Sequence, residues 1–279
     1  PVEKMPEVLA SYARHPYAAS PGEEPHEGIP PKALQDMLKT IKAQRGYDFG
    51  GYKRGTLRRR IQRRMSLRGV LRDADYAAIL KQEPGEVDAL FRDLLIGVTE
   101  FFRDAEAWKT LDTEVLGPLI ASKHRDEPIR IWVTGTSTGE EAYTMAMVVL
   151  DRLRRARKIC PVQIFATDTS DEALDVGRRG RYPAGIVTQI TPARLRRYFV
   201  EDPDHQTFQV SQKLRETVVF GVQNIFGDPP FARVDLISCR NVLIYLEPEV
   251  QQRIIGIFHF ALRPEGHLFL GTAESVGGR

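Results

Sequence analysis

The sequence predicts an α/β fold in which a parallel sheet carries a small inserted subdomain and is preceded by an all-α region. Three observations predict it. From Ile129 onward, short apolar runs alternate with amphipathic helical stretches, as strands and crossover helices do in a parallel sheet. Before that point, the periodic stretches have the spacing of helices. Between Arg181 and Thr217 an arginine-rich stretch of sequence interrupts this alternation, which predicts an inserted subdomain.

The bulk composition fits a globular protein. Of 279 residues, 42% are hydrophobic and 28% charged, enough for one sizeable core and a second small one. No apolar run approaches the roughly 20 residues of a membrane-spanning helix, so we expect no membrane insertion. The chain begins with neither a signal-peptide pattern nor an initiator methionine, and we expect a cytoplasmic segment of a longer protein. Cys160 and Cys239 lie far apart, which argues against disulfides and against a metal site.

The all-α region is expected over residues 29–104, after a linker or tail of a preceding domain over residues 1–28 that is rich in proline, glycine and charge. Apolar residues recur at i, i+3, i+4 and i+7 from Leu34 to Ile41, which predicts a first helix. Further helices are predicted from near Tyr52 through Met65, over 73–83, over 84–97 and, within a linker of residues 105–127, near Asp104–Ser122.

The second of these helices is strongly basic, although the net charge of the chain is only +3. Its cationic residues include Arg54, Arg58, Arg59, Arg60, Arg63 and Arg64. A solvated helix face usually mixes signs, so this run predicts a binding surface for an anionic partner. Composition leaves open whether that partner is an acidic protein surface, a nucleic acid or a membrane. Few aromatic residues accompany the arginines, which disfavours a nucleic acid.

The sheet region is expected over residues 128–279, with the insert over about 181–217. The predicted strands are Ile129–Val133, Val162–Ala166, Val218–Val222, Val234–Ser238 and His267–Gly271. The predicted crossover helices are Glu140–Ala156, Asp171–Arg178 and Glu249–Leu262.

A glycine turn, Gly135 to Gly139, joins the first strand to its helix, as in a nucleotide-binding crossover. Glycine lets the backbone pass close to a ligand, which makes Gly135 a candidate cofactor contact. Alone this signal is weak. Glu140 and Glu141 then open the helix, where they would repel a phosphate. A ligand with a cationic amino group fits better, and S-adenosylmethionine carries both an ammonium and a sulfonium. The alternative is stabilisation of the helix dipole by two acids.

Polar residues follow the other strands at the same edge of the sheet. Asp168 ends the second strand, where an acid typically accepts hydrogen bonds from ribose hydroxyls. As a cap for the next helix, Ser170 and Asp171 are better placed. Asn224 and Asn241 follow the third and fourth strands and are candidates for the adenine edge or the methionine end of a cofactor. Each alone is equally well explained as a turn residue or a helix cap.

The segment Thr99–Arg103 combines a hydroxyl, two aromatic rings and a guanidinium. From the residues alone, the favoured interpretation is a helix end with Phe101 and Phe102 in the core and Arg103 in solvent.

Together these segments resemble the CheR-type chemotaxis receptor methyltransferases. The matching stretches are Gly97–Arg103, Ile131–Tyr143, Ala166–Asp168 and Cys239–Tyr245, in the family's order, within a resemblance from about residue 30 to the end. The resemblance implies a Rossmann-like S-adenosylmethionine methyltransferase sheet with an inserted small β-subdomain, preceded by an all-α domain that recognises the receptor. Residues 2–15 resemble the end of a methylesterase domain, which suggests an excerpt from a methylesterase–methyltransferase fusion.

The resemblance also assigns roles. It implies an S-adenosylmethionine pocket lined by Thr99, Arg103, Glu140, Asp168, Asn224, Ile225, Asn241 and Val242. The reaction would be direct displacement, in which a receptor glutamate takes the methyl group and S-adenosylhomocysteine leaves. Arg103 and Tyr245 are the catalytic candidates. The basic helix would lie along the cytoplasmic coiled coil of the receptor.

The sequence departs from the family pattern in places. Gly97 stands where some members have an asparagine that contacts the cofactor, and Thr136 replaces a usual Cys or Ala. The short loop between Phe199 and Phe208 lacks a glycine-rich insertion, which argues against docking of a receptor tail. Two other functions stay open: an S-adenosylmethionine-dependent nucleic-acid methyltransferase, and a non-catalytic module that binds S-adenosylmethionine for regulation.

Overall fold

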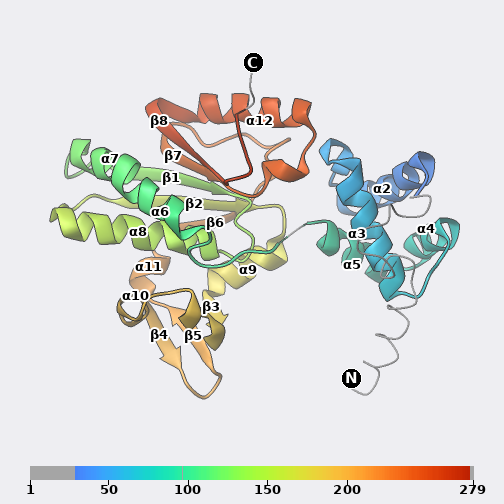
Figure 1. Cartoon of the computed structure of the whole chain (residues 1–279), viewed down its shortest axis with the longest axis horizontal. Coiled ribbons are helices and arrows are strands. Elements are labelled where there is room, and N and C mark those ends of the chain that lie inside the picture. Colours follow the sequence, from blue (N-terminus) through green and yellow to red (C-terminus); the bar gives the residue numbers. More distant parts are fainter. Residues whose placement is uncertain (1–28, 96, 277–279) are drawn as a thin grey trace. The chain divides into compact units, whose positions relative to one another are not determined.

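The computed structural model describes residues 29–95 and 97–276, drawn in colour in Figure 1. The described residues form two compact units: residues up to 95 together with Tyr245–Glu247, and Gly97–Ile244 together with residues 248–276. The predicted tail over residues 1–28, with its methylesterase-like stretch, lies outside the described residues. No helix in the described part of the chain has the length and hydropathy needed to cross a membrane.

The first unit is built of helices, which confirms the predicted all-α region. They are α2 (Pro31–Arg45), α3 (Arg54–Leu67), α4 (Asp73–Gln82) and α5 (Pro84–Leu94), with a 3₁₀ turn at Phe49–Gly51. Leu34, Ile61, Leu80 and Leu90 supply one buried residue from each helix to a common core. Because these apolar residues follow the helical period, the sequence alone located the helices to within three residues of their ends.

One arginine of the basic helix is directed into this unit. Arg64 donates from Nε and Nη2 to the carboxylate of Glu86, at 2.7 and 2.9 Å, and the Tyr76 hydroxyl donates to the same carboxylate at 2.8 Å. Glu86 is almost fully buried. A buried carboxylate needs such a partner, so the Arg64 guanidinium has a structural use. We therefore leave Arg64 out of the partner surface proposed below.

The second unit contains a five-stranded parallel sheet of order β6-β2-β1-β7-β8. Its strands are β1 (Ile129–Thr134), β2 (Val162–Asp168), β6 (Val218–Val222), β7 (Val234–Cys239) and β8 (Leu262–Leu270). The chain first runs outward from β1 to β2 and β6, then returns to β7 beside β1. This reversal makes a topological switch point at the carboxyl ends of β1 and β7, where open α/β sheets bind ligands.

Helices cover both faces of this sheet (Figure 1). Ile131 and Val133 of β1 point into a core shared with α8 (Glu140–Ala156), whereas Trp132 between them packs edge-on against Phe258 of α12 (Pro248–Ala261). A strand buried on both faces explains why β1 is apolar at successive positions. Helix α9 (Asp171–Arg179) connects β2 to the insert. The predicted α/β fold is confirmed.

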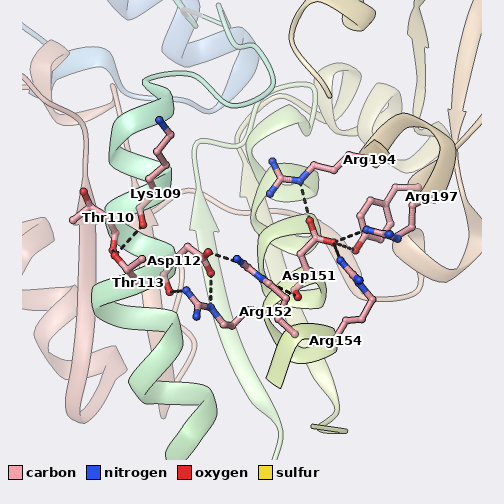
Figure 2. A network of polar contacts seen from close by, with 11 residues as sticks. Lys109, Thr110, Asp112, Thr113, Asp151, Arg152, Arg154, Arg194 and Arg197 are labelled. Atoms are coloured by element: carbon pink, nitrogen blue, oxygen red, sulfur yellow. Dashed lines mark hydrogen bonds and ion pairs between the residues drawn. The ribbon is translucent and has the colours of Figure 1, made fainter. Parts of the chain in front are cut away.

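The predicted linker helix is continuous but changes its winding. Helix α6 (Ala105–Thr110) passes through a π-helical segment, Leu111–Leu116, into α7 (Gly117–Ser122). The wide turn frees Asp112, whose carboxylate accepts from Arg152 Nε at 2.7 Å and from Arg155 Nη2 at 2.6 Å. Figure 2 shows this contact between the linker helix and α8. The sequence periodicity did not distinguish this single π turn from the α-helical winding on either side of it.

The insert is a three-stranded antiparallel sheet of order β3-β5-β4. Its elements are β3 (Arg181–Pro183), a 3₁₀ turn (Ala184–Thr188), α10 (Pro192–Tyr198), β4 (Phe199–Asp202), β5 (Thr207–Val210) and α11 (Gln212–Arg215). Asp151 of α8 joins it to the main sheet, accepting from Arg194 Nε at 2.9 Å and Arg197 Nη1 at 3.2 Å (Figure 2). One carboxylate therefore holds two arginines of α10 against α8.

Candidate functional site

The loop after β1 has a backbone conformation that favours glycine at its two ends. Gly135 and Gly139 have φ angles of 62° and 95°, in the left-handed region that side chains disfavour. A Cβ on Gly135 would lie 2.6 Å from Val242 Cγ2, and a Cβ on Gly139 would lie 3.0 Å from the ring of Phe220. The loop after β1 thus contacts the loop after β7, while Gly135 itself is exposed. A ligand can approach its backbone.

Asp168 ties the loops after β1 and β2 together. Its Oδ2 accepts from the Ser137 amide at 2.8 Å and its Oδ1 from the Ser170 amide at 2.9 Å. Helix α9 is capped by Ser170, one of the two residues that the sequence predicted, and its Oγ accepts from the Ala173 amide. Burial raises the pKa of the Asp168 carboxyl. Each carboxylate oxygen keeps a second lone pair, so Asp168 can also accept from a ribose hydroxyl.

The two acids at the start of α8 have different surroundings. Glu140 accepts from Thr138 Oγ1 at 2.6 Å, within the loop after β1. Glu141 accepts from Ser238 Oγ at 2.7 Å and lies 3.6 Å from Arg240 Nη1, at the end of β7. Burial raises the pKa of both carboxyls. Glu141 therefore has internal partners in the sheet, and Glu140 is the acid that faces the glycine loop.

A carboxylate that sequence reasoning missed shapes the loop after β7. Glu274 accepts from four backbone amides, those of Asn241, Val242, Leu243 and Gly271, at 2.7 to 2.8 Å. It holds Asn241 in a left-handed conformation, with φ of 59°. The available sequence signal was an acid directly after the last strand, which does not reveal its partners. Glu274 sets the course of the backbone at two predicted cofactor residues, Asn241 and Val242.

The segment Thr99–Arg103 lies against the same loops. Phe101 is buried, with its ring 5.0 Å from that of Tyr182 in the insert, whereas Phe102 and Arg103 are half-buried. The Arg103 side chain is partly exposed, as expected, and its Nη1 donates to the Val98 carbonyl at 3.2 Å. Ser137 Oγ donates to the Gly97 carbonyl at 3.2 Å, which links this segment to the glycine loop.

The insert also contacts the site, which the sequence did not indicate. The Tyr182 hydroxyl donates to the Thr138 carbonyl at 2.7 Å, and the Gln189 side chain accepts from the Phe101 amide at 3.0 Å. Burial raises the pKa of Tyr182, so it remains a donor at neutral pH. Both the glycine loop and the Thr99–Arg103 segment are thus braced from the insert.

Three other predicted positions have fewer contacts with the glycine loop. Asn224 forms the turn after β6, with Oδ1 accepting from the Phe226 amide at 3.1 Å, and Ile225 follows it in that turn. Its neighbour Gln223 donates to the Asp168 carbonyl at 2.9 Å, so the turn adjoins the end of β2. Tyr245 belongs to the first unit, where its carbonyl accepts from the Lys53 amide. Its catalytic role stays a prediction.

Two family descriptions match the chain in tandem. Residues 32–95 match "CheR methyltransferase, all-alpha domain", and residues 97–279 match "CheR methyltransferase, SAM binding domain". The chain belongs to the CheR methyltransferase family. S-adenosylmethionine is accordingly the cofactor of its second unit.

Curated relatives agree with this CheR assignment. The chain is 30% identical to chemotaxis protein methyltransferase 1 of Vibrio cholerae over 259 residues, which is 90% of this chain and 91% of that protein. It is 32% identical to the chemotaxis protein methyltransferase of Escherichia coli over 250 residues, 86% of this chain and 82% of that protein. A 104.1 kDa protein of Rhodobacter capsulatus is 37% identical over 247 residues, and there the chain spans 26% of the relative's length.

The residues at this CheR site fit S-adenosylmethionine chemically. Burial raises the pKa of Glu140 and of Asp168, and a cationic ligand would stabilise their ionised forms, while the exposed backbone of Gly135 is open to a ligand. Thr136 Oγ1 and two nitrogens of Arg240 are buried without a hydrogen-bond partner. Such atoms also occur elsewhere among the described residues, for example Arg58 Nε and Thr207 Oγ1, so they support the fit only together with the glycine loop and the two acids.

Proposed function

We propose that this chain methylates glutamate side chains of a methyl-accepting chemotaxis receptor and forms glutamyl methyl esters. The single observation that carries the proposal is the placement of Arg103, half-buried on a segment bonded to the glycine loop through Ser137 and Gly97. A guanidinium there can bind a carboxylate beside the cofactor. The names of the Vibrio cholerae and Escherichia coli relatives support the assignment to chemotaxis.

In the proposed reaction, the protein aligns the attacking carboxylate oxygen with the methyl group of the cofactor. The bound cofactor supplies a methyl group on a sulfonium. A glutamate carboxylate, with an ordinary pKa of about 4.3, is ionised at neutral pH and needs no general base. Arg103 would orient that carboxylate or hold the cofactor, so that oxygen, carbon and sulfur come into line. Tyr245 is the second catalytic candidate.

The remaining predicted residues would hold the cofactor. In this proposal Glu140 receives its ammonium and Asp168 its ribose hydroxyls, while Gly135 lets it approach the backbone. Thr99, Asn224, Ile225, Asn241 and Val242 complete the pocket, as the family resemblance implies. Glu274 binds the backbone amides of Asn241 and Val242 and so fixes the backbone at two of these positions before a cofactor binds. This supports the assignment of both residues to the pocket.

The receptor surface is proposed on α3. Arg54 and Arg59 are exposed, and Arg58, Arg60 and Arg63 are partly exposed on the same helix. An acidic receptor coiled coil complements such a surface by charge. Pairing of this kind weakens as salt rises. The affinity for a receptor fragment can be measured between about 50 and 300 mM salt, where the Debye length changes roughly twofold. An affinity that does not change over this range would contradict the proposed surface.

Radiolabelled S-adenosylmethionine tests the proposal directly. The chain is incubated with a cytoplasmic receptor fragment, and the product is treated with alkali to release volatile methanol. Label released by base indicates a glutamyl methyl ester, whereas label that resists base contradicts the proposal. Label appearing in added RNA or DNA instead points to a nucleic-acid methyltransferase. Tight binding of S-adenosylhomocysteine without any transfer points to a non-catalytic regulatory module.

A further inference from the structure

The backbone turn that carries Arg103 is strained on both sides. Phe102 and Asp104, its two neighbours, have φ angles of 54° and 59°, in the left-handed region that residues with a Cβ rarely adopt. Such conformations persist only where the surroundings hold them, and they gather at functional sites. The contacts that hold this turn therefore bear on how Arg103 works.

Two side chains converge on the Arg103 carbonyl oxygen. Trp108 Nε1 donates to it at 2.9 Å, and Arg240 Nη2 donates to it at the same distance. The same Arg240 nitrogen also donates to Asp104 Oδ2 at 2.8 Å. One guanidinium group thus fixes both the carbonyl of Arg103 and the side chain of the strained residue that follows.

Arg240 is itself held rigidly. Its side chain is fully buried directly after β7, and its guanidinium lies over the rings of Phe269 and Trp108, at 4.8 and 5.3 Å from their centres. Nη1 lies 3.6 Å from Glu141 Oε2. Nε and Nη1 have no hydrogen-bond partner, so the guanidinium is held by its Nη2 bonds and by the two rings. The burial also excludes direct contact with a substrate in this conformation.

We propose that Arg240 is a positioning residue for methyl transfer, which sets the Arg103 side chain by clamping the backbone turn beneath it. The proposal rests on the function proposed above only in taking Arg103 as the residue that meets the reacting groups. Lysine cannot replace Arg240, because a single ammonium has neither the planar face that stacks on two rings nor the geometry to serve the carbonyl and the carboxylate together.

Arg240→Lys tests this in the full chain, with Arg152→Lys as the matched control. Arg152 is also partly buried and bonded to a carboxylate and a carbonyl, both of Asp112, away from the turn. For Arg240→Lys we expect kcat to fall about tenfold or more, with the Kd for S-adenosylhomocysteine within about threefold of the unmodified protein. For Arg152→Lys we expect no change in kcat.

Combination with Arg103→Ala separates positioning from general damage. If Arg240 acts through Arg103, adding Arg240→Lys to Arg103→Ala causes no further loss of kcat. An equal loss in both backgrounds overturns the proposal, and so does an Arg240→Lys variant with unaltered kcat.

Hydrogen exchange of peptides spanning residues 97–104 gives a reading that needs no substrate. The amides of Phe101 and Phe102, which donate to Gln189 and Thr144, should exchange about tenfold faster in Arg240→Lys and unchanged in Arg152→Lys. Unchanged exchange in Arg240→Lys overturns the proposal. Faster exchange in a protein that never methylates the receptor fragment supports the clamp and contradicts the proposed function instead.

Discussion

The two ends of the parallel sheet differ in how completely their buried charged side chains are hydrogen-bonded. At the amino end, Asp235 of β7 accepts from Lys123 Nζ at 2.9 Å, from the Arg130 amide at 2.8 Å and from Arg263 Nη1 at 2.8 Å. Lys123 places its other protons on Glu127 and on the Pro128 carbonyl. Every proton of that ammonium is used, and the group can be understood as support for the fold.

At the carboxyl end, the same strands lead to a less complete set of contacts. Thr136 Oγ1 and two nitrogens of Arg240 are buried without partners, and the backbone is left-handed at Gly135 and Asn241. Such groups lower stability unless something else stabilises them. The amino end also has an unpaired buried nitrogen, Arg130 Nε, and a left-handed residue, Arg233. The two ends therefore differ in how completely their buried charged side chains are paired, and the less completely paired end is the one proposed above for the cofactor.

Lys123→Met should have the largest effect on stability and none on the site. Removing the ammonium leaves Asp235 buried with fewer partners, and we expect the free energy of unfolding to fall by about 3–5 kcal/mol in urea titrations. Lys109→Met, which alters an exposed ion pair, is the control. A weaker affinity of the folded Lys123 variant for S-adenosylhomocysteine would contradict the separation between the two ends.

Arg103→Ala should lower activity and leave stability nearly unchanged. We expect kcat with a receptor fragment to fall about 100-fold, equivalent to about 2.7 kcal/mol of transition-state stabilisation. The midpoint of thermal unfolding should stay within about 2 °C, because the Trp108 and Arg240 bonds to the Arg103 carbonyl remain and the side chain adds only an exposed bond to the Val98 carbonyl. Arg125→Ala, at an exposed position, is the control. If activity survives, the catalytic role of Arg103 is wrong.

Gly135→Ala should weaken cofactor binding by about tenfold. The left-handed backbone disfavours alanine by about 1–2 kcal/mol, and the new methyl would press on Val242. Calorimetric titration with S-adenosylhomocysteine measures the change. Gly185→Ala is the matched control, since a Cβ there meets nothing within 4 Å. Equal affinities in the two variants would show that the glycine loop does not carry the cofactor.

Glu140→Gln should give the smallest effect, about threefold in affinity at pH 7.5. Burial raises the pKa of Glu140, and a bound ammonium favours its ionised form. Protonation of Glu140 as pH falls from 7 toward 5 therefore weakens binding of S-adenosylhomocysteine, and Glu140→Gln should reduce this pH dependence. Some dependence remains because burial also raises the pKa of Asp168. Glu106→Gln, on exposed α6, should leave it intact.

Local cues were sufficient for much of the fold. The helix Glu140–Ala156 was predicted with the bounds that the structure has, because a glycine turn, two acids in the first turn and an apolar face all indicate the same start. Position alone favoured Ser170 or Asp171 over Asp168 as the cap of α9, and the structure has Ser170, which accepts from the Ala173 amide. These features depend on residues within a few positions of one another.

The unpredicted features depend on partners far along the chain. Arg64 belongs to a run of similar arginines, and only Glu86, 22 positions later, distinguishes it. Arg240 is buried by rings from α6 and β8, which no periodicity connects. Sequence patterns therefore could not predict the role proposed for Arg240 or the four amides that Glu274 binds.

The position of Glu274 affects how a minimal enzyme should be engineered. A chain shortened after Gly271 would keep all five strands of the described parallel sheet. Its secondary structure alone would not reveal that a contact is missing. It would lack the carboxylate that binds the amides of Asn241, Val242 and Leu243. Such a truncated protein should fold and yet bind cofactor poorly, so residue 274 belongs inside any functional boundary.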